Sequence, residues 1–128
     1  TMRHLGREHT QTTALLQRYN DLTMAMIPWR LASGFYRNIL NEPDSFEECQ
    51  TATMQAYSNM ILFELGLWNE DAVQEALAIL QKVGLHMDRH GAIHDCPGSP
   101  TFTENGTSTE MQAFWLMLYA MLKRAGAV

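Results

Sequence analysis

Several features that mark other classes of protein are scarce in this 128-residue sequence. Its two cysteines, Cys49 and Cys96, are too few for the disulfide framework of a small secreted domain. No apolar run approaches the roughly 20 residues that a membrane-spanning helix needs. The first ten residues, TMRHLGREHT, contain no apolar segment and do not read as a signal peptide. These absences favour a cytoplasmic location.

Basic residues are also few. Lysine and arginine number 9 against 14 aspartates and glutamates, which gives a net charge of -5. This balance argues against nucleic acid or an anionic membrane as a partner. Apolar residues make up 46% of the chain, enough for a sizeable core, and no repeat or proline-rich linker divides it. We therefore expect residues 1–128 to form a single domain.

Hydrophobic periodicity predicts four helices, at about residues 13–27, 46–65, 70–83 and 108–123. The first helix carries one apolar stripe, formed by Leu15, Leu16, Tyr19, Leu22 and Met26. The third also carries one, formed by Val73, Ala76, Leu77, Leu80 and Val83. The second and fourth helices are apolar in almost every direction around their axes, which is typical of fully buried helices. The predicted fold class is all-α.

Both all-round apolar helices have hydroxyl residues at their predicted starts. Ser45 with Glu48, and Thr107 with Glu110, match the capping-box pattern, and Ser108 adds another hydroxyl. Its place in the capping box is enough to explain a glutamate at position 48, so we do not assign Glu48 a role as a general acid or base. No catalytic residue is assigned in this chain.

The alternation of one-faced and buried helices indicates two concentric layers, as in an α/α toroid. Four helices do not close such a ring. The chain is therefore either part of a larger ring or covers its apolar helices with another copy. In a toroid the inner helices all run the same way, so their N-terminal ends gather at one mouth and favour an anionic ligand there. The alternative is that the hydroxyls only cap the helices.

Three histidines recur every four residues in the long segment between the last two predicted helices. His86, His90 and His94 have a spacing that on one helix would suit zinc. Gly84 and Gly91 interrupt a helix there, so we interpret the three as solvated loop residues. We expect no metal ion and no cofactor.

Two segments carry a resemblance to a known family. Residues 34–57, GFYRNILNEPDSFEECQTATMQAY, resemble a stretch of the unsaturated uronyl hydrolases of glycoside hydrolase families 88 and 105. Residues 91–118, GAIHDCPGSPTFTENGTSTEMQAFWLML, are similar to the final loop and inner helix of some members. Arg37 and Asn38 stand where the family has a His-Gln pair, which puts substrate specificity in question.

The resemblance implies a six-hairpin (α/α)6 toroid, of which this chain is the C-terminal third. Family members remove the terminal unsaturated uronic acid from oligosaccharides that polysaccharide lyases release. Their catalytic Asp lies upstream of the matched stretch, so the chain alone is expected to be inactive. The remaining N-terminal part or a second copy is the expected protein partner, and an acidic oligosaccharide the expected substrate.

We predict five substrate-binding residues: Tyr36, Arg37, Glu48, Thr107 and Ser108. Tyr36 would stack on a sugar ring, Arg37 would meet a carboxylate or sulfate, and Ser108 with nearby backbone would meet an anion. An alternative interpretation belongs to another class of protein. In it, the chain is a non-catalytic helical interaction domain that self-associates through exposed apolar helices.

Overall fold

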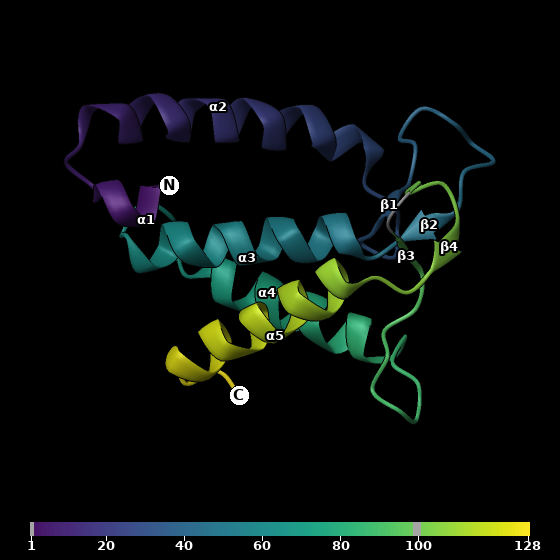
Figure 1. The fold of residues 1–128 in the computed structure, drawn as a ribbon. Helices are drawn as coiled ribbons and strands as arrows, with labels where there is room; N and C mark the ends of the chain where they lie inside the picture. Colours follow the sequence, from purple (N-terminus) through teal and green to yellow (C-terminus); the bar gives the residue numbers. More distant parts are fainter. Residues whose placement is uncertain (1, 99–100) are drawn as a thin grey trace.

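A computed structural model describes residues 2–98 and 101–128 and shows a mainly helical chain (Figure 1). The helices are α1 (Met2–Leu5), α2 (Thr10–Met26), the 3-10 turn η1 (Ile27–Trp29), α3 (Gln50–Glu64), α4 (Asp71–Gly84) and α5 (Thr109–Arg124). The strands are β1 (Tyr36–Arg37), β2 (Glu47–Glu48), β3 (Cys96–Pro97) and β4 (Asn105–Gly106). The all-α fold class predicted from the sequence is confirmed.

The core lies where α3, α4 and α5 meet. α4 buries one stripe, as its 3.6-residue periodicity predicts, and its opposite face remains in solvent. The buried residues of that stripe are Ala72, Ala76, Ile79, Leu80 and Val83. α5 is fixed against α4 by the indole N–H of Trp115, which donates to the carbonyl of Leu80 at 3.4 Å. α4 therefore covers both of the helices that the sequence marked as most apolar.

Those two helices are covered to different extents. α3 buries Ala52, Thr53, Ala56, Asn59, Met60 and Leu62, which point in several directions around its axis. α5 buries only Met111, Leu118, Met121 and Leu122. The expectation that α5 is buried on every side is wrong for this chain, because Leu116 is 60% exposed and Met117 is 37% exposed.

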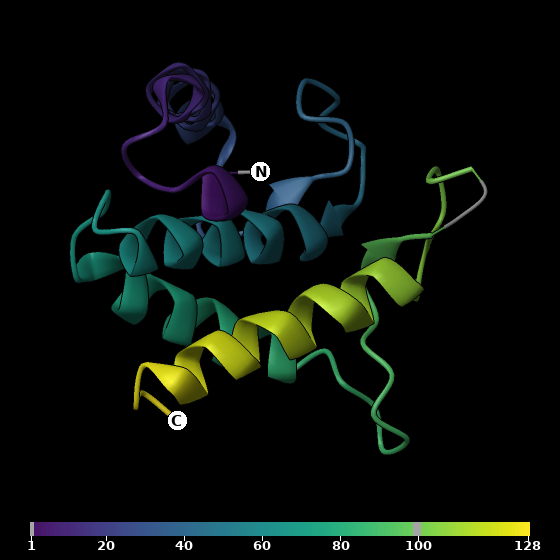
Figure 2. The same cartoon turned by 60° about the vertical axis from the view of Figure 1, so that its left-hand side comes forward.

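α2 crosses above α3 and is seen end on in Figure 2. Its predicted apolar stripe reaches the core only in part: Met26 packs against the buried cluster, whereas Leu22 is 57% exposed. A polar seam also attaches α2 to the core. The Tyr19 hydroxyl donates to Asn59 Oδ1 at 2.6 Å, and Asn59 Nδ2 donates to Glu75 Oε2 at 3.2 Å. Part-buried side-chain hydrogen bonds thus add to a limited apolar contact at this junction.

Two short antiparallel ladders lie at the end of the molecule where α3 and α5 begin. In the first, Tyr36 pairs with Glu48, and in the second, Cys96 pairs with Gly106. The backbone N–H of Cys49 donates to the carbonyl of Asp95 at 3.0 Å and so joins the segments that follow β2 and precede β3. In the described part of the chain, no helix has the length and apolar character to cross a membrane.

Candidate functional site at the starts of α3 and α5

The first residue of the site is Glu48, which holds the N-terminal end of α3. Its side chain is buried, and its carboxylate accepts the backbone N–H groups of Gln50 at 2.6 Å and Thr51 at 3.0 Å. A carboxylate in this position satisfies two N–H groups that the helix leaves free and complements its positive end. Glu48 is therefore the capping group of α3.

The predicted capping residue of α3, Ser45, has another role. Its hydroxyl accepts the backbone N–H of Ile39 at 2.9 Å, within the turn that connects β1 to β2. The helix begins at Gln50, because Glu47 and Glu48 are held in the ladder with β1. The prediction that Ser45 caps α3 is therefore wrong, although the Ser-x-x-Glu pattern did find the residue that caps the helix.

Burial sets the electrostatics of Glu48. Removal from water raises the pKa of its carboxyl above the ordinary value, while hydrogen bonds from Thr51 and Gln50 lower it. Since both described backbone partners belong to the first turn of α3, the carboxylate is directed toward the helix and not toward solvent. Its geometry suits it to position α3 at the site.

Ser108 performs the capping function for α5. Its hydroxyl oxygen accepts the backbone N–H of Met111 at 3.0 Å, so of the two hydroxyl residues predicted at this helix start Ser108 is the cap, and Thr107 is an exposed residue one position earlier. The same hydroxyl donates to Gln50 Oε1 at 2.9 Å. This bond joins the first residue of α3 to the cap of α5, across 58 positions of sequence.

α3 and α5 therefore begin at the same end of the molecule and run away from it in the same general direction (Figure 1). This arrangement confirms the prediction that the two apolar helices begin at one end of the molecule, and we call this end the mouth. Each helix contributes partial positive charge there through backbone N–H groups. Beside the start of α5 lies an open hollow of about 370 Å³, lined by His90, Gly91, Ala92, Thr107, Ser108, Thr109 and Gln112.

Tyr36 and Arg37 occupy different environments at this end. The Tyr36 ring is 1% exposed and its hydroxyl donates to Gln55 Oε1 at 2.8 Å, so it offers no face for a sugar to stack on. Arg37 is half-buried, and its guanidinium donates to the carbonyl of Ser45 at 2.8 Å. Among the residues that the structure describes, no carboxylate forms an ion pair with Arg37. Its charge is free to meet an external anion.

Of the five predicted site residues, the structure places Tyr36, Glu48 and Ser108 in contact with the first half of α3. Arg37 lies one residue from Tyr36 on β1, with its guanidinium turned to the β1–β2 turn, and Thr107 lies next to Ser108 on the rim of the hollow. Sequence reasoning missed Gln50, which links the two helix starts. No local pattern marks a residue whose partner lies so far along the chain.

Two thiols lie directly beneath the mouth. Cys49 and Cys96 are both 0% exposed, and both are free. Burial raises the pKa of the Cys49 thiol to about 12, and the nearby Cys96 adds to the rise. Burial also raises the pKa of the Cys96 thiol. Hydrogen bonding with Ser108 offsets part of that rise. These thiols act as structural residues and are poor nucleophiles.

The loop histidines pair with aspartates. His86 Nδ1 lies 2.7 Å from Asp95 Oδ2, and His94 Nε2 lies 3.0 Å from Asp88 Oδ2. A hydrogen bond from Asn105, with one from His86, lowers the pKa of Asp95, and one from His94 lowers that of Asp88. Within residues 2–98 and 101–128, no group of three or more histidine, cysteine or acidic side chains is arranged to hold a metal ion.

Comparison with known proteins gives one solved structure at high similarity. No protein-family model matches the sequence, and no curated protein matches it. The structure is the crystal structure of a possible member of the GH105 family from Salmonella enterica subsp. enterica serovar Paratyphi A str. ATCC 9150, with a TM-score of 0.75. The alignment covers 93% of this chain and 34% of that chain at 16% sequence identity. At this identity the likeness shows the fold alone, and this chain matches about a third of the length of that structure.

Proposed function

We propose that this chain supplies part of the substrate-binding mouth of a glycoside hydrolase that acts on oligosaccharides with a terminal unsaturated uronic acid. The observation that carries the proposal is the Ser108–Gln50 hydrogen bond, which holds the N-terminal ends of α3 and α5 together. A site built from two helix N-termini favours an anion, and a uronic acid carries a carboxylate. The segments that resemble the unsaturated uronyl hydrolases contain both of these residues.

Each site residue has a role that its environment supports. Arg37, which lacks a carboxylate partner among the described residues, would bind the uronate carboxylate through a charge-assisted hydrogen bond. Thr107 would contact sugar oxygens from the rim of the hollow at the start of α5, and Ser108 would hold that rim through its bonds to Gln50 and Met111. Tyr36 and Glu48 would act from beneath, the first by holding Gln55 and the second by holding the start of α3.

The proposal assigns binding, and not the chemical step, to this chain. In the family that the sequence resembles, an Asp protonates the enol-ether double bond, and that Asp lies in the part preceding the matched stretch. No residue of this chain occupies its position. We therefore expect the chain to bind the substrate without turning it over.

We expect the chain to bind an unsaturated uronyl disaccharide and to lose affinity when Arg37 is replaced by alanine. Removing a charge-assisted hydrogen bond of about 1.5 kcal/mol should weaken binding about tenfold. Isothermal titration calorimetry measures the change, with a neutral saturated disaccharide as the ligand control. The matched protein control is Lys123→Ala, which removes an exposed charge at the far end of α5 and should leave the affinity unchanged.

Two results would contradict the proposal. One is equal binding of the neutral and the unsaturated uronyl disaccharide, since the site would then not recognise the anion. The other is an unchanged affinity in Arg37→Ala, with the variant folded as judged by circular dichroism, since the cation at the mouth would then have no part in recognition.

A further inference from the structure

α5 carries a second apolar stripe that no part of the described chain covers. Residues Ala113, Leu116, Met117 and Ala120 follow the spacing of one helical face, and all four are exposed. The opposite face of the same helix is the one packed into the core, through Met111, Leu118 and Leu122. We name the exposed set the α5 stripe. A helix that is apolar on two opposite faces is built to be packed on both.

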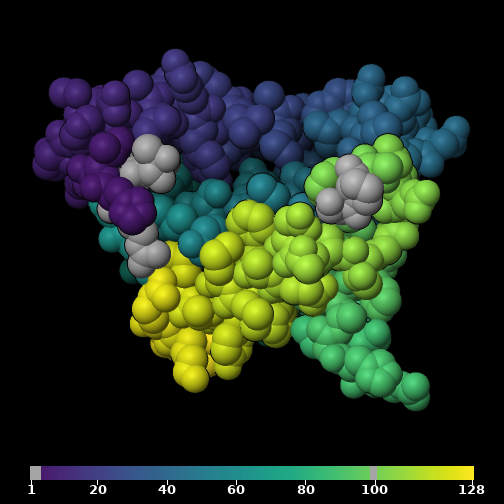
Figure 3. Space-filling view, viewed as in Figure 1, coloured from purple at the N-terminus to yellow at the C-terminus, as the bar shows by residue number. Residues whose placement is uncertain are grey.

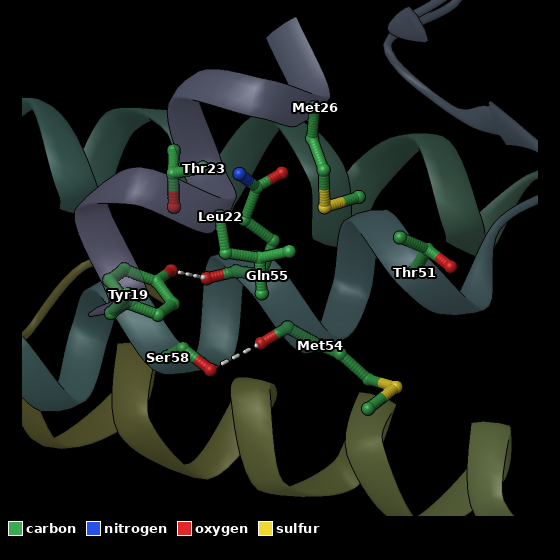
Figure 4. Close-up of a pocket in the computed structure, with 8 residues that line it drawn as sticks. All are labelled: Tyr19, Leu22, Thr23, Met26, Thr51, Met54, Gln55 and Ser58. Carbon is green, nitrogen blue, oxygen red and sulfur yellow. Dashed lines mark hydrogen bonds between the residues drawn. The ribbon is translucent and has the colours of Figure 1, made fainter. Parts of the chain in front are cut away.

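An apolar groove lies between α2 and α3 (Figure 4). It has a volume of about 210 Å³, and Leu22, Met26 and Met54 supply much of its wall. Leu22 and Met54 are 57% and 39% exposed, so the groove is open to solvent. We name it the α2–α3 groove. It exists because the polar seam through Tyr19 and Asn59 attaches α2 without closing its apolar residues onto α3.

The helix that carries the stripe and the two helices that form the groove border one face of the molecule. Figure 3 shows α5 and part of α3 on the same side, with α2 along their upper edge. A two-fold dimer brings the same face of two copies together, so that a contact from one copy to the other is made twice. A ridge and a groove on one face are therefore able to pair reciprocally, each stripe with the partner's groove.

The accessible surface area of the chain is larger than that expected of a compact monomer, which agrees with the loss of a partner surface. Its accessible surface is 7756 Å². A compact monomer of 14.6 kDa is expected to expose about 6,900 Å², so the excess is about 850 Å². One partner in a stable protein–protein interface of standard size buries about 800 Å². The excess matches what one copy loses in a dimer.

We propose that two copies of this chain associate, with the α5 stripe of each copy inserted in the α2–α3 groove of the other. The proposal goes beyond the function proposed above and does not depend on it, since neither the stripe nor the groove contains any of the five residues to which that function is assigned. It also says which surfaces would make the contact in the alternative stated above, in which the chain self-associates through exposed apolar helices.

Light scattering after size-exclusion chromatography tests the proposal on the full chain. We expect twice the mass of 14.6 kDa at high micromolar concentration and a return to the single mass on dilution. Leu116→Asp, on the stripe, and Met54→Asp, in the groove, should each give a monomer. Gln74→Asp, which places the same charge on the exposed face of α4, should leave the dimer intact. Circular dichroism confirms that each variant is folded.

Mixing the two monomeric variants makes the test specific for stripe-in-groove contact. A pair formed by Leu116→Asp and Met54→Asp retains one intact stripe opposite one intact groove, so a dimer should reappear in the mixture and in neither variant alone. A monomeric wild-type chain overturns the proposal. So does a dimer that either aspartate variant leaves intact, and so does a mixture that stays monomeric, because the stripe would then pack against something other than the groove.

Discussion

Replacing Leu118 with alanine is expected to lower the free energy of unfolding by about 2–5 kcal/mol. Leu118 is 0% exposed and lies on the face of α5 that packs into the core with α3 and α4. Removing its side chain leaves a cavity whose walls belong to several helices and cannot close fully. The loss would be a large part of the stability of a domain of this size. Urea unfolding followed by circular dichroism measures it.

Leu85 provides the matched control, because it has the same side chain and is 85% exposed at the end of α4. Leu85→Ala should change the free energy of unfolding by no more than about 0.5 kcal/mol. Equal effects at the two positions would contradict the assignment of the inner face of α5. A larger effect at Leu85 would show that the chain packs in a different arrangement.

The second large effect concerns the two thiols beneath the mouth. At pH 8 a thiol with a pKa of about 12 in place of 9.0 has roughly a thousandfold less of the reactive thiolate. Cys49 and Cys96 are also shielded from reagents by burial. In the native chain we therefore expect both to react with a thiol reagent at least about 100-fold more slowly than in the unfolded chain.

Labelling with iodoacetamide, followed by mass spectrometry, measures each rate separately. The control is Gln74→Cys, which adds an exposed thiol on α4 and should be labelled at the rate of an unfolded thiol. Fast labelling of Cys49 or Cys96 in the native chain would contradict the described mouth, since Cys49 lies between the two residues that hold the start of α3 and Cys96 lies against the cap of α5.

Local patterns were sufficient to predict the four longer helices, but not the short α1 or the 3-10 turn η1. The apolar stripe of α4 and the continuous apolar residues of α5 placed both helices within a residue of their observed ends. The start of α3 was predicted four residues too early, because Glu47 and Glu48 pair with β1. A two-residue ladder has no periodicity of its own, so the pattern along the sequence could not reveal that contact.

The coverage of the helices could not be predicted in the same way. The apolar residues around α5 predicted a helix buried on every side. Periodicity does not say whether the residues that bury it belong to the same chain. For α2, the stripe predicted apolar contact with the core along its length, whereas Met26 makes such a contact and hydrogen bonds of Tyr19 and Asn59 complete the attachment. Both departures arise from contacts between distant parts of the sequence.

The candidate site was predicted in outline. The argument that the two apolar helices begin side by side was right, and it named two residues that hold their starts, Glu48 and Ser108. It named Ser45 as the cap of α3, where the Glu48 carboxylate holds the helix start, and it named Thr107 beside Ser108 for α5, where Ser108 is the cap. It also gave Tyr36 an exposed ring, since burial of a strand residue depends on what packs over the strand.

The central claim is that α3 and α5 begin at one shared mouth, and a double-mutant cycle on Gln50 and Ser108 tests it most directly. Free energies of unfolding are measured for the wild type, Gln50→Ala, Ser108→Ala and the double variant. If the two side chains share the hydrogen bond that the structure shows, the two losses are not additive, and the coupling is about 0.5–1.5 kcal/mol. Losses that add within about 0.3 kcal/mol would mean that the helix starts are not joined, and would contradict the mouth on which the proposed function depends.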